Sequence, residues 1–385
     1  MTKKLLNWLE YLAIFSISII ITLPNTLQGI FAFTYDQGRD FLAVAKIVQD
    51  KDPVLIGQTT GLGGIFYGPW WYYFLLPIYI FANGDPQKVA TFFAIFGSVT
   101  ILAIYFLLKR ITKNIFLSAS LAISSAMIAN WMLMPVMIWN PVVVPFLILF
   151  FIYLIYKTLK NENILYLLVL GITSGLILDF SAGFGVIFLT STFFTFLIFS
   201  KFRRISFFLS FISGVFVITF PRILFELRNS FLMTKTTINY LQEPKIYGDH
   251  FNLFERFLNR MDLYKQLFTS AVTNNNQIIT LVIFAYLAFL TVNYLRQKKS
   301  REIFLKDELL KFLFVLNIFI FILFSLFPDR IWDYYLIGLP VMIVVVVAKV
   351  LNFSFTDKYL KIVSSVFLVL LLFFNFNLNL IPPYI

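Results

Sequence analysis

Apolar runs of roughly 20 residues follow one another along most of this sequence, a pattern typical of helices that cross a lipid bilayer. The first extends roughly from Leu9 to Ile30, and a second from Lys88 to Leu108. The remaining predicted spans are Ile115–Ala129, Val142–Tyr156, Ile164–Leu178, Gly185–Phe199, Ile205–Leu224, Ile278–Leu295, Leu309–Phe327, Tyr335–Val350 and Ile362–Leu378. The pattern therefore predicts an all-α polytopic membrane protein with about eleven spans, in one transmembrane domain covering residues 1–385.

Two long segments that carry charge interrupt the series of spans and are expected to be outer loops, at about 31–87 and about 225–277. In the first, Arg39 to Asp50 has helical periodicity, which predicts a short helix on the membrane surface with an apolar stripe of Phe41, Val44, Ala45 and Val48. Five glycines between positions 57 and 68 then predict a loop that can approach a ligand closely.

The apolar segment Trp70–Ala82 is too short to cross a bilayer. At 1.5 Å per residue it reaches about 20 Å, against a hydrocarbon core of about 30 Å. Basic clusters, which gather in the cytoplasm, also require an odd number of crossings between Pro69 and Lys109, and the run Lys88–Leu108 supplies one. We therefore expect a re-entrant or surface helix on the outer side.

Charge and composition narrow the class further. Lysine and arginine number 31 against 19 acidic residues, a net charge of +12, and this surplus lies mainly in clusters between the spans. The clusters predict a multi-pass protein of the cell's inner (plasma) membrane with a cytoplasmic N-terminus, an uncleaved first helix and an outer C-terminus. Nucleic-acid binding would require a basic soluble face, and the sequence shows none. The absence of cysteine excludes thiolate sites, and the single histidine, His250, argues against zinc.

Polar side chains collect at the turns predicted to face outward. A cavity at this level would suit glycosyl transfer from a lipid phosphate, which needs a carboxylate base and cations that stabilise the departing phosphate. Asp36 is the candidate base, and Arg39, Arg222 and Arg228 are the candidate cations. The alternative for Asp36 is a plain helix N-cap, and single charges such as Asp179 are often solvated. The other outward candidates are Gln37, Asp40, Asn140, Glu226, Asp329, Arg330, Asp333, Tyr334 and Tyr335.

The order of these segments resembles the glycosyltransferases of the C-type membrane fold. The likeness is to the protein O-mannosyltransferase and lipid A aminoarabinose transferase group, family 39, and covers roughly residues 1–230. In TYDQGRD, Asp36 matches the catalytic Asp of the family and Arg39 its Arg, while Gln37 stands where the family has Glu. GPWWYYFLL matches a proline-aromatic segment, WNP at 139–141 matches an Asp-Pro or Asn-Pro, and PRILFELRNSF matches a later segment of bacterial relatives.

The resemblance implies transfer of a sugar from a polyprenyl-phosphate donor to an acceptor hydroxyl of a glycan, lipid or protein at the outer face. Gln37, Arg39, Asp40, Asn140, Arg222, Arg228 and Tyr335 are the expected substrate and phosphate ligands. A single base predicts inversion at the anomeric carbon. No cofactor or metal site is indicated. The alternatives are a flippase or transporter of lipid-linked saccharides, or a polymerase of them. Many transporters are built from two related halves, and the absence of a convincing internal repeat here counts against that alternative.

Overall fold

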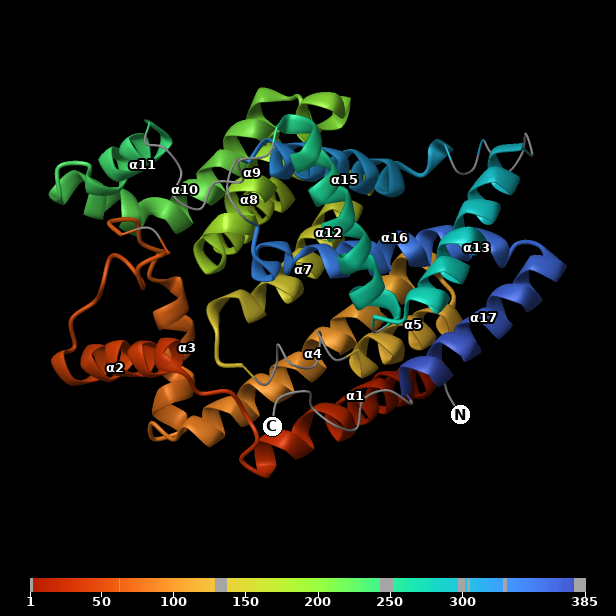
Figure 1. Cartoon of the computed structure of the whole chain (residues 1–385), viewed down its shortest axis with the longest axis horizontal. Helices are drawn as coiled ribbons and strands as arrows, with labels where there is room; N and C mark the ends of the chain where they lie inside the picture. Colours follow the sequence, from red (N-terminus) through yellow and green to blue (C-terminus); the bar gives the residue numbers. More distant parts are fainter. Residues whose placement is uncertain are drawn as a thin grey trace.

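The computed structural model describes residues 3–61, 63–128, 137–242, 252–273, 275–296, 302, 305–327 and 331–376. These residues form helices without a regular strand (Figure 1). The elements are α1 (Lys3–Leu27), α2 (Tyr35–Asp50), α3 (Trp70–Phe81), α4 (Pro86–Thr112), α5 (Ile115–Met127), η1 (Asn140–Val143), α7 (Val144–Lys160), α8 (Ile164–Phe180), α9 (Ala182–Ile198), η2 (Ser200–Phe202), α10 (Ile205–Arg228), α11 (Leu232–Gln242), α12 (Leu253–Thr273), α13 (Gln277–Arg296), α15 (Glu308–Leu326), η3 (Asp333–Leu336), α16 (Leu339–Ser354) and α17 (Lys358–Phe376).

The spans predicted from the apolar pattern are helices in the structure. Seven helical segments of the described chain are long and apolar enough to cross a membrane: α1, α4, η1 with α7, α10, α13, α15 and α17. The shorter apolar helices α5, α8, α9 and α16 occupy the other predicted spans. The all-helical membrane class is confirmed, and the helices agree with about eleven spans. Tyr335, predicted to begin a span, lies in η3 instead.

Ion pairs join the helix ends at one end of the bundle. Lys109 at the end of α4 pairs with Glu10 in α1. Lys201 pairs with Glu308 at the start of α15, with Nζ 2.7 Å from the carboxylate oxygen, and Lys349 pairs with the adjacent Asp307. The basic clusters of these segments therefore lie at one end of the bundle, as the topology prediction requires.

Helices α8 and α10 cross at close range through glycine. A Cβ on Gly171 would collide with the backbone oxygen of Phe211, and a Cβ on Gly214 would collide with that of Leu168. Small residues at such a crossing let helix backbones approach within a membrane, where dispersion contacts drive association. This contact joins the first half of α8 to the first half of α10.

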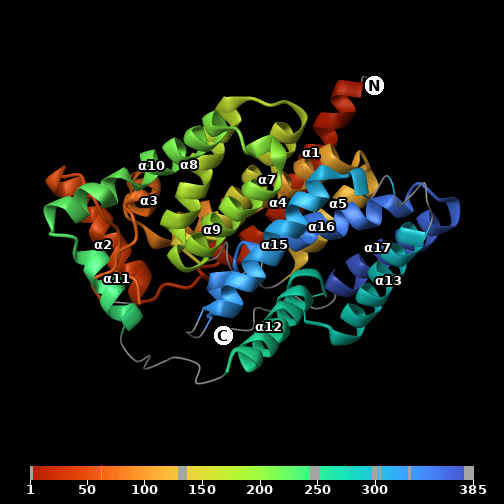
Figure 2. The same ribbon diagram turned by 90° about the horizontal axis from the view of Figure 1, so that it is seen from above.

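The opposite end of the bundle carries α2, α3 and α11, which lie together on the left in both Figure 1 and Figure 2. The backbone N–H of Trp70, the first residue of α3, donates to Asp179 near the end of α8 at 3.1 Å. After α3 a short turn leads to α4, where Gln87 donates to the backbone oxygens of Thr26 and Leu27 at the end of α1, each at 3.0 Å. Helix α3 thus begins and ends at the same end of the bundle and, as predicted, does not cross it.

Candidate active site

The first turn of α2 carries the candidate base, Asp36. The helix begins at Tyr35, four residues earlier than predicted, and its N-cap is Thr34. The backbone N–H and the hydroxyl of Thr34 donate to Oε1 of Gln37, at 2.7 and 2.6 Å. The alternative that Asp36 is the N-cap is therefore wrong, because Thr34 holds that position. Asp36 lies inside the first turn, where the helix dipole favours a negative charge.

The buried face of α2 differs from the predicted apolar stripe. Phe41 and Val44 are buried as expected, but Val48 is 40% exposed. Gln37 and Asp40 complete the buried face instead. The polar side chains turn inward because the structure supplies partners for them, which an apolar pattern cannot show.

Arg39 joins two carboxylates on α2. Its Nη1 lies 2.9 Å from Asp36, and its Nε and Nη2 lie 3.0 and 2.9 Å from Oδ1 of Asp40. The indole N–H of Trp71 in α3 donates to Oδ2 of Asp40 at 2.7 Å. The side chain of Asp36 is 49% exposed, whereas that of Asp40 is fully buried. Of the two carboxylates, only Asp36 is open to an incoming molecule.

The electrostatics of this cluster follow from the unequal burial. Burial raises the pKa of Asp40 above its usual range, and the favourable bonds from Arg39 and Trp71 only partly offset this. Burial alone would lower the pKa of Arg39, but Asp40 and Asp36 outweigh it and raise that pKa. Arg39 therefore stays charged beside both carboxyl groups.

Tyrosines from three separate segments surround the cluster. Burial raises the pKa of Tyr67 to about 12; nearby Tyr335 and Asp36 add to the rise and Arg39 opposes it. Burial likewise raises the pKa of Tyr72 in α3, with Asp40 contributing and a hydrogen bond to Arg39 opposing. These phenols stay neutral at physiological pH and can donate hydrogen bonds to a ligand.

Asp179 and Arg222 form a second, buried charged pair. Nη2 of Arg222 lies 3.3 Å from Oδ1 of Asp179, whose side chain is fully buried. The other oxygen of Asp179 accepts from the backbone N–H of Trp70, and the Trp70 indole donates to the backbone oxygen of Ile218 in α10 at 2.8 Å. The expectation that Asp179 is a solvated helix end is wrong, because this carboxylate binds the start of α3.

Asn140 and Tyr335 approach the same end of the bundle from two other segments. The side-chain amide of Asn140 donates to the backbone oxygen of Phe180 at 2.6 Å, which ties η1 to the end of α8. The ring of Tyr335 packs on that of Tyr334, which in turn packs on Trp139, with centroids 4.6 and 5.2 Å apart. Tyr335 and Asp36 both raise the pKa of Tyr67, so the structure brings these two residues near the same phenol, whereas the amide of Asn140 is bonded to Phe180.

The remaining sequence candidates are not brought into the cluster. Arg228 is exposed at the end of α10. Glu226 accepts from the backbone N–H groups of Met233 and Thr234, at 2.7 and 2.9 Å, and so stabilises the start of α11. His250, Asp329 and Arg330 lie outside the described residues.

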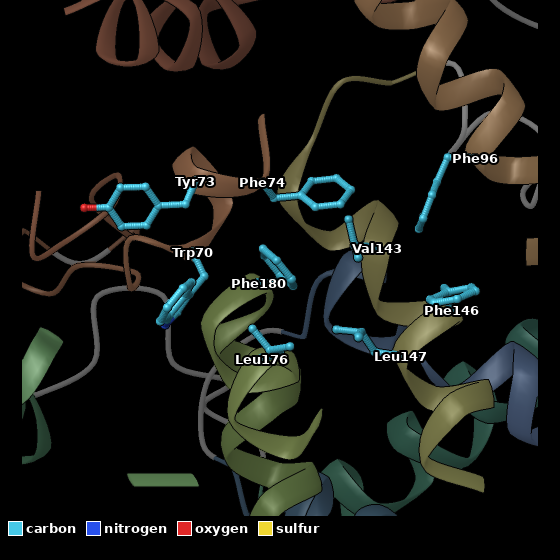
Figure 3. Close-up of a pocket in the computed structure, with 9 residues that line it drawn as sticks. All are labelled: Trp70, Tyr73, Phe74, Phe96, Val143, Phe146, Leu147, Leu176 and Phe180. Carbon is cyan, nitrogen blue, oxygen red and sulfur yellow. The ribbon is translucent and has the colours of Figure 1, made fainter. Parts of the chain in front are cut away.

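An apolar cavity of about 390 Å³ lies between α3, α4, α7 and α8 (Figure 3). A second cavity, of about 560 Å³, shares Tyr73 and Phe74 with it and extends between α3 and the start of α4, with Lys88 at its lining. The side chains that line the first are Trp70, Tyr73, Phe74, Phe96, Val143, Phe146, Leu147, Leu176 and Phe180. Such a lining suits a hydrocarbon chain.

The sequence interpretation missed Trp71, Tyr67 and Tyr72, which surround the Asp36–Arg39–Asp40 cluster. Trp71 and Tyr72 were placed only on a re-entrant or surface helix, and Tyr67 was given no role, because nothing in a single sequence indicates a contact with Asp40 or Arg39. Among the described residues, no three His, Cys, Asp or Glu side chains lie close enough to hold a metal ion.

No protein-family model matches this sequence, and no curated protein sequence matches it. Several solved structures share its fold, among them two of an archaeal oligosaccharyltransferase. A crystal structure of the oligosaccharyltransferase of Archaeoglobus fulgidus, in complex with Zn and sulfate, aligns with a TM-score of 0.55 and 13% identity over 95% of this chain and 52% of that one. The archaeal oligosaccharyltransferase AglB of the same organism, in complex with an inhibitory peptide and a dolichol-phosphate, aligns with a TM-score of 0.54 and 13% identity over 97% and 55%.

The chain thus spans about half the length of these solved structures. At 13% identity the likeness establishes the fold and not the activity. The predicted fold class, that of the C-type membrane glycosyltransferases, is confirmed. Membership of the family 39 group stays a prediction.

Proposed function

We propose that this protein is an integral-membrane glycosyltransferase that uses a polyprenyl-phosphate-linked sugar as donor. The observation that carries the proposal is the exposed Asp36 joined to Arg39 within a C-type fold. A carboxylate open to solvent can accept a proton, and the adjacent guanidinium can stabilise negative charge on a departing phosphate. The dolichol-phosphate bound in one of the similar structures is a ligand of the same chemical class.

In the proposed reaction Asp36 takes the proton of an acceptor hydroxyl as its oxygen attacks the anomeric carbon. The bond from that carbon to the phosphate oxygen breaks, and the electron pair leaves with the lipid phosphate. Direct displacement inverts the configuration, in analogy to glycosidases that have no carboxylate nucleophile. Asp40 does not serve as that nucleophile in this scheme, because it is fully buried.

Arg39 is the favoured cation for the phosphate. A guanidinium has five N–H bonds, and those engaged by Asp36, Asp40 and Tyr72 leave at least one for a phosphate oxygen. Arg222 is paired with Asp179, and Arg228 is exposed at the end of α10. The roles of Arg222 and Arg228 as phosphate ligands stay predictions. The location of the reaction at the outer face also stays a prediction.

The apolar cavity between α3, α4, α7 and α8 supports a lipid-linked donor. We expect Leu147→Trp, which fills this cavity, to weaken the binding of donors with a long polyprenyl chain. The binding of donors with a short chain should be unchanged. Phe150→Trp on the same helix is the matched control, because Phe150 is 38% exposed and does not line the cavity. Equal effects on both donor lengths would remove the cavity from the proposal.

The test of the function is transfer by the purified protein in liposomes. Polyprenyl phosphates carrying a radiolabelled hexose are supplied with a membrane extract as acceptor, and inverted product is measured. Arg39→Lys is expected to lose most activity, because lysine cannot form the planar fork that joins both carboxylates. Lys46→Arg, an exposed change on the same helix, is the control. Movement of the donor across the bilayer without covalent transfer would instead establish the transporter alternative.

A further inference from the structure

Gln58 lies in the loop that joins α2 to α3, within a short two-stranded ribbon. The backbone N–H of Gly57 donates to the oxygen of Tyr67, and the N–H of Tyr67 donates to the oxygen of Gln58, both at 2.9 Å. A bridge between Thr59 and Phe66 sets the antiparallel register. Tyr67 thus bonds to two successive residues, Gly57 and Gln58, and both stand opposite it, as in a β-bulge.

The side-chain amide of Gln58 is buried and unpaired. The residue is 4% exposed, and neither its Nε2 nor its Oε1 has a hydrogen-bond partner. Among the described residues it is the only amide side chain with both polar atoms in this state. Buried polar groups in folded proteins are nearly always hydrogen-bonded, so the position requires an explanation.

The bulge indicates where Gln58 lies relative to the candidate site. Both residues of the longer strand lie across from the single residue that they oppose, so Gln58 is a neighbour of Tyr67. The phenol of Tyr67 lies within the electrostatic range of Asp36, Arg39 and Tyr335. Gln58 is therefore held on the ribbon beside a residue of the candidate active site.

The chemistry of the unpaired atoms selects the ligand. A primary amide offers two donors and one acceptor. A phosphate, which only accepts, would leave Oε1 unpaired, whereas a sugar hydroxyl both donates and accepts. On the basis of the proposed function, we propose that Gln58 binds a hydroxyl of the donor sugar and so selects which sugar is transferred.

The neighbours of the ribbon allow such a ligand to be enclosed. Gly64, with a φ of +83°, lies directly against Thr236 of α11, and Phe66 packs on Phe225 with ring centroids 5.6 Å apart. The second polar segment therefore covers the ribbon from outside. A sugar held by Gln58 would lie between this cover and the Asp36–Arg39 pair.

The test replaces the amide by an apolar side chain of similar length. Gln58→Met, with Gln58→Leu as a second variant, is compared with Thr59→Val, an exposed change on the alternate face of the same ribbon. Binding is measured for polyprenyl phosphate carrying a hexose and for the same lipid without sugar. We expect Gln58→Met to weaken binding of the sugar-bearing lipid by about tenfold, which corresponds to the loss of a hydrogen bond worth about 1.4 kcal/mol. Binding of the sugar-free lipid should not change. The melting temperature should stay the same or rise.

Monodeoxy forms of the hexose identify the hydroxyl. One of these deoxy sugars should bind wild-type protein about tenfold more weakly than the full sugar does. The same deoxy sugar and the full sugar should bind Gln58→Met equally well, because removing the hydroxyl and removing the amide abolish the same contact. A lower melting temperature in both variants, or equal weakening of the two lipids, would overturn the assignment and show a structural amide. If wild-type protein binds neither lipid, the proposed function falls, and this inference with it.

Discussion

Neutralising Asp36 and Asp40 one at a time should separate catalysis from stability. Both carboxylates contact Arg39, but the side chain of Asp36 is 49% exposed and that of Asp40 is fully buried. We expect Asp36→Asn to abolish transfer with little loss of stability. We expect Asp40→Asn to destabilise the protein, so that its activity follows the fraction that remains folded.

The magnitudes follow from the contacts. Asn in place of Asp36 keeps an oxygen that Arg39 can contact, and exposed pairs contribute at most about 1 kcal/mol. Loss of a general base costs about 10²–10⁴ in rate, or about 3–5 kcal/mol in the barrier. Asp40 accepts from Arg39 and from the Trp71 indole on different oxygens. Asn has one acceptor oxygen, so at least one buried donor loses its partner, at a cost of about 1–3 kcal/mol.

The assay combines thermal unfolding in detergent with transfer rates normalised to folded protein. Asp40→Ala provides the internal check, because it removes both acceptors and should cost about twice as much as the Asn variant. If Asp36→Asn folds and transfers sugar at a near-normal rate, Asp36 is not the base, and the proposed mechanism is refuted. If Asp40→Asn melts with the wild type, the account of the Arg39 cluster is wrong.

Three further predictions test the surroundings of this cluster. Gly68→Ala should lower the folded yield, because its Cβ would collide with a buried carboxylate, whereas Gly63→Ala meets no atom within 4 Å and should be neutral. Folding raises the pKa of the Tyr67 phenol from 10.0 to about 12, so this group stabilises the folded wild type below pH 10 and loses that contribution as the pH rises to 12. Tyr67→Phe should therefore lack this loss of stability between pH 10 and 12. An identical pH profile in the two proteins would refute the burial of Tyr67. Cysteine at Lys88 should react with an impermeant reagent only from outside and cysteine at Arg110 only from inside; the reverse would invert the topology.

The spans were predictable because each depends on local sequence. An apolar run must be helical in a bilayer, where every backbone N–H and C=O needs a partner within the segment. The run Trp70–Ala82 could be excluded from the spans on length and on the charge of its neighbours alone, and the structure has a helix there of nearly the same extent. The opening of α2 was harder, since Thr34 and Asp36 are both acceptable N-caps.

The partners of the candidate residues were not predictable, because they come from distant parts of the chain. Asp179 lies 109 residues from Trp70, and its burial depends on how α8 meets the start of α3. A carboxylate at the end of an apolar run is compatible with both solvation and burial. A single sequence holds no information on which distant N–H reaches it. For the same reason, the apolar stripe of α2 could not predict that Asp40 is buried and bonded to Trp71.

The adjacent residues Trp70 and Trp71 explain how a rigid bundle can position a site on a surface helix. Trp70 is bound to α8 through its backbone N–H and to α10 through its indole. Trp71 points elsewhere and binds Asp40 of α2, which holds Arg39. Two successive side chains of one short helix therefore connect the packed membrane helices to the side chains proposed to react. Asp179 of the buried pair holds Trp70, which also lines the apolar cavity, so both ends of a lipid-linked donor would be held against one frame.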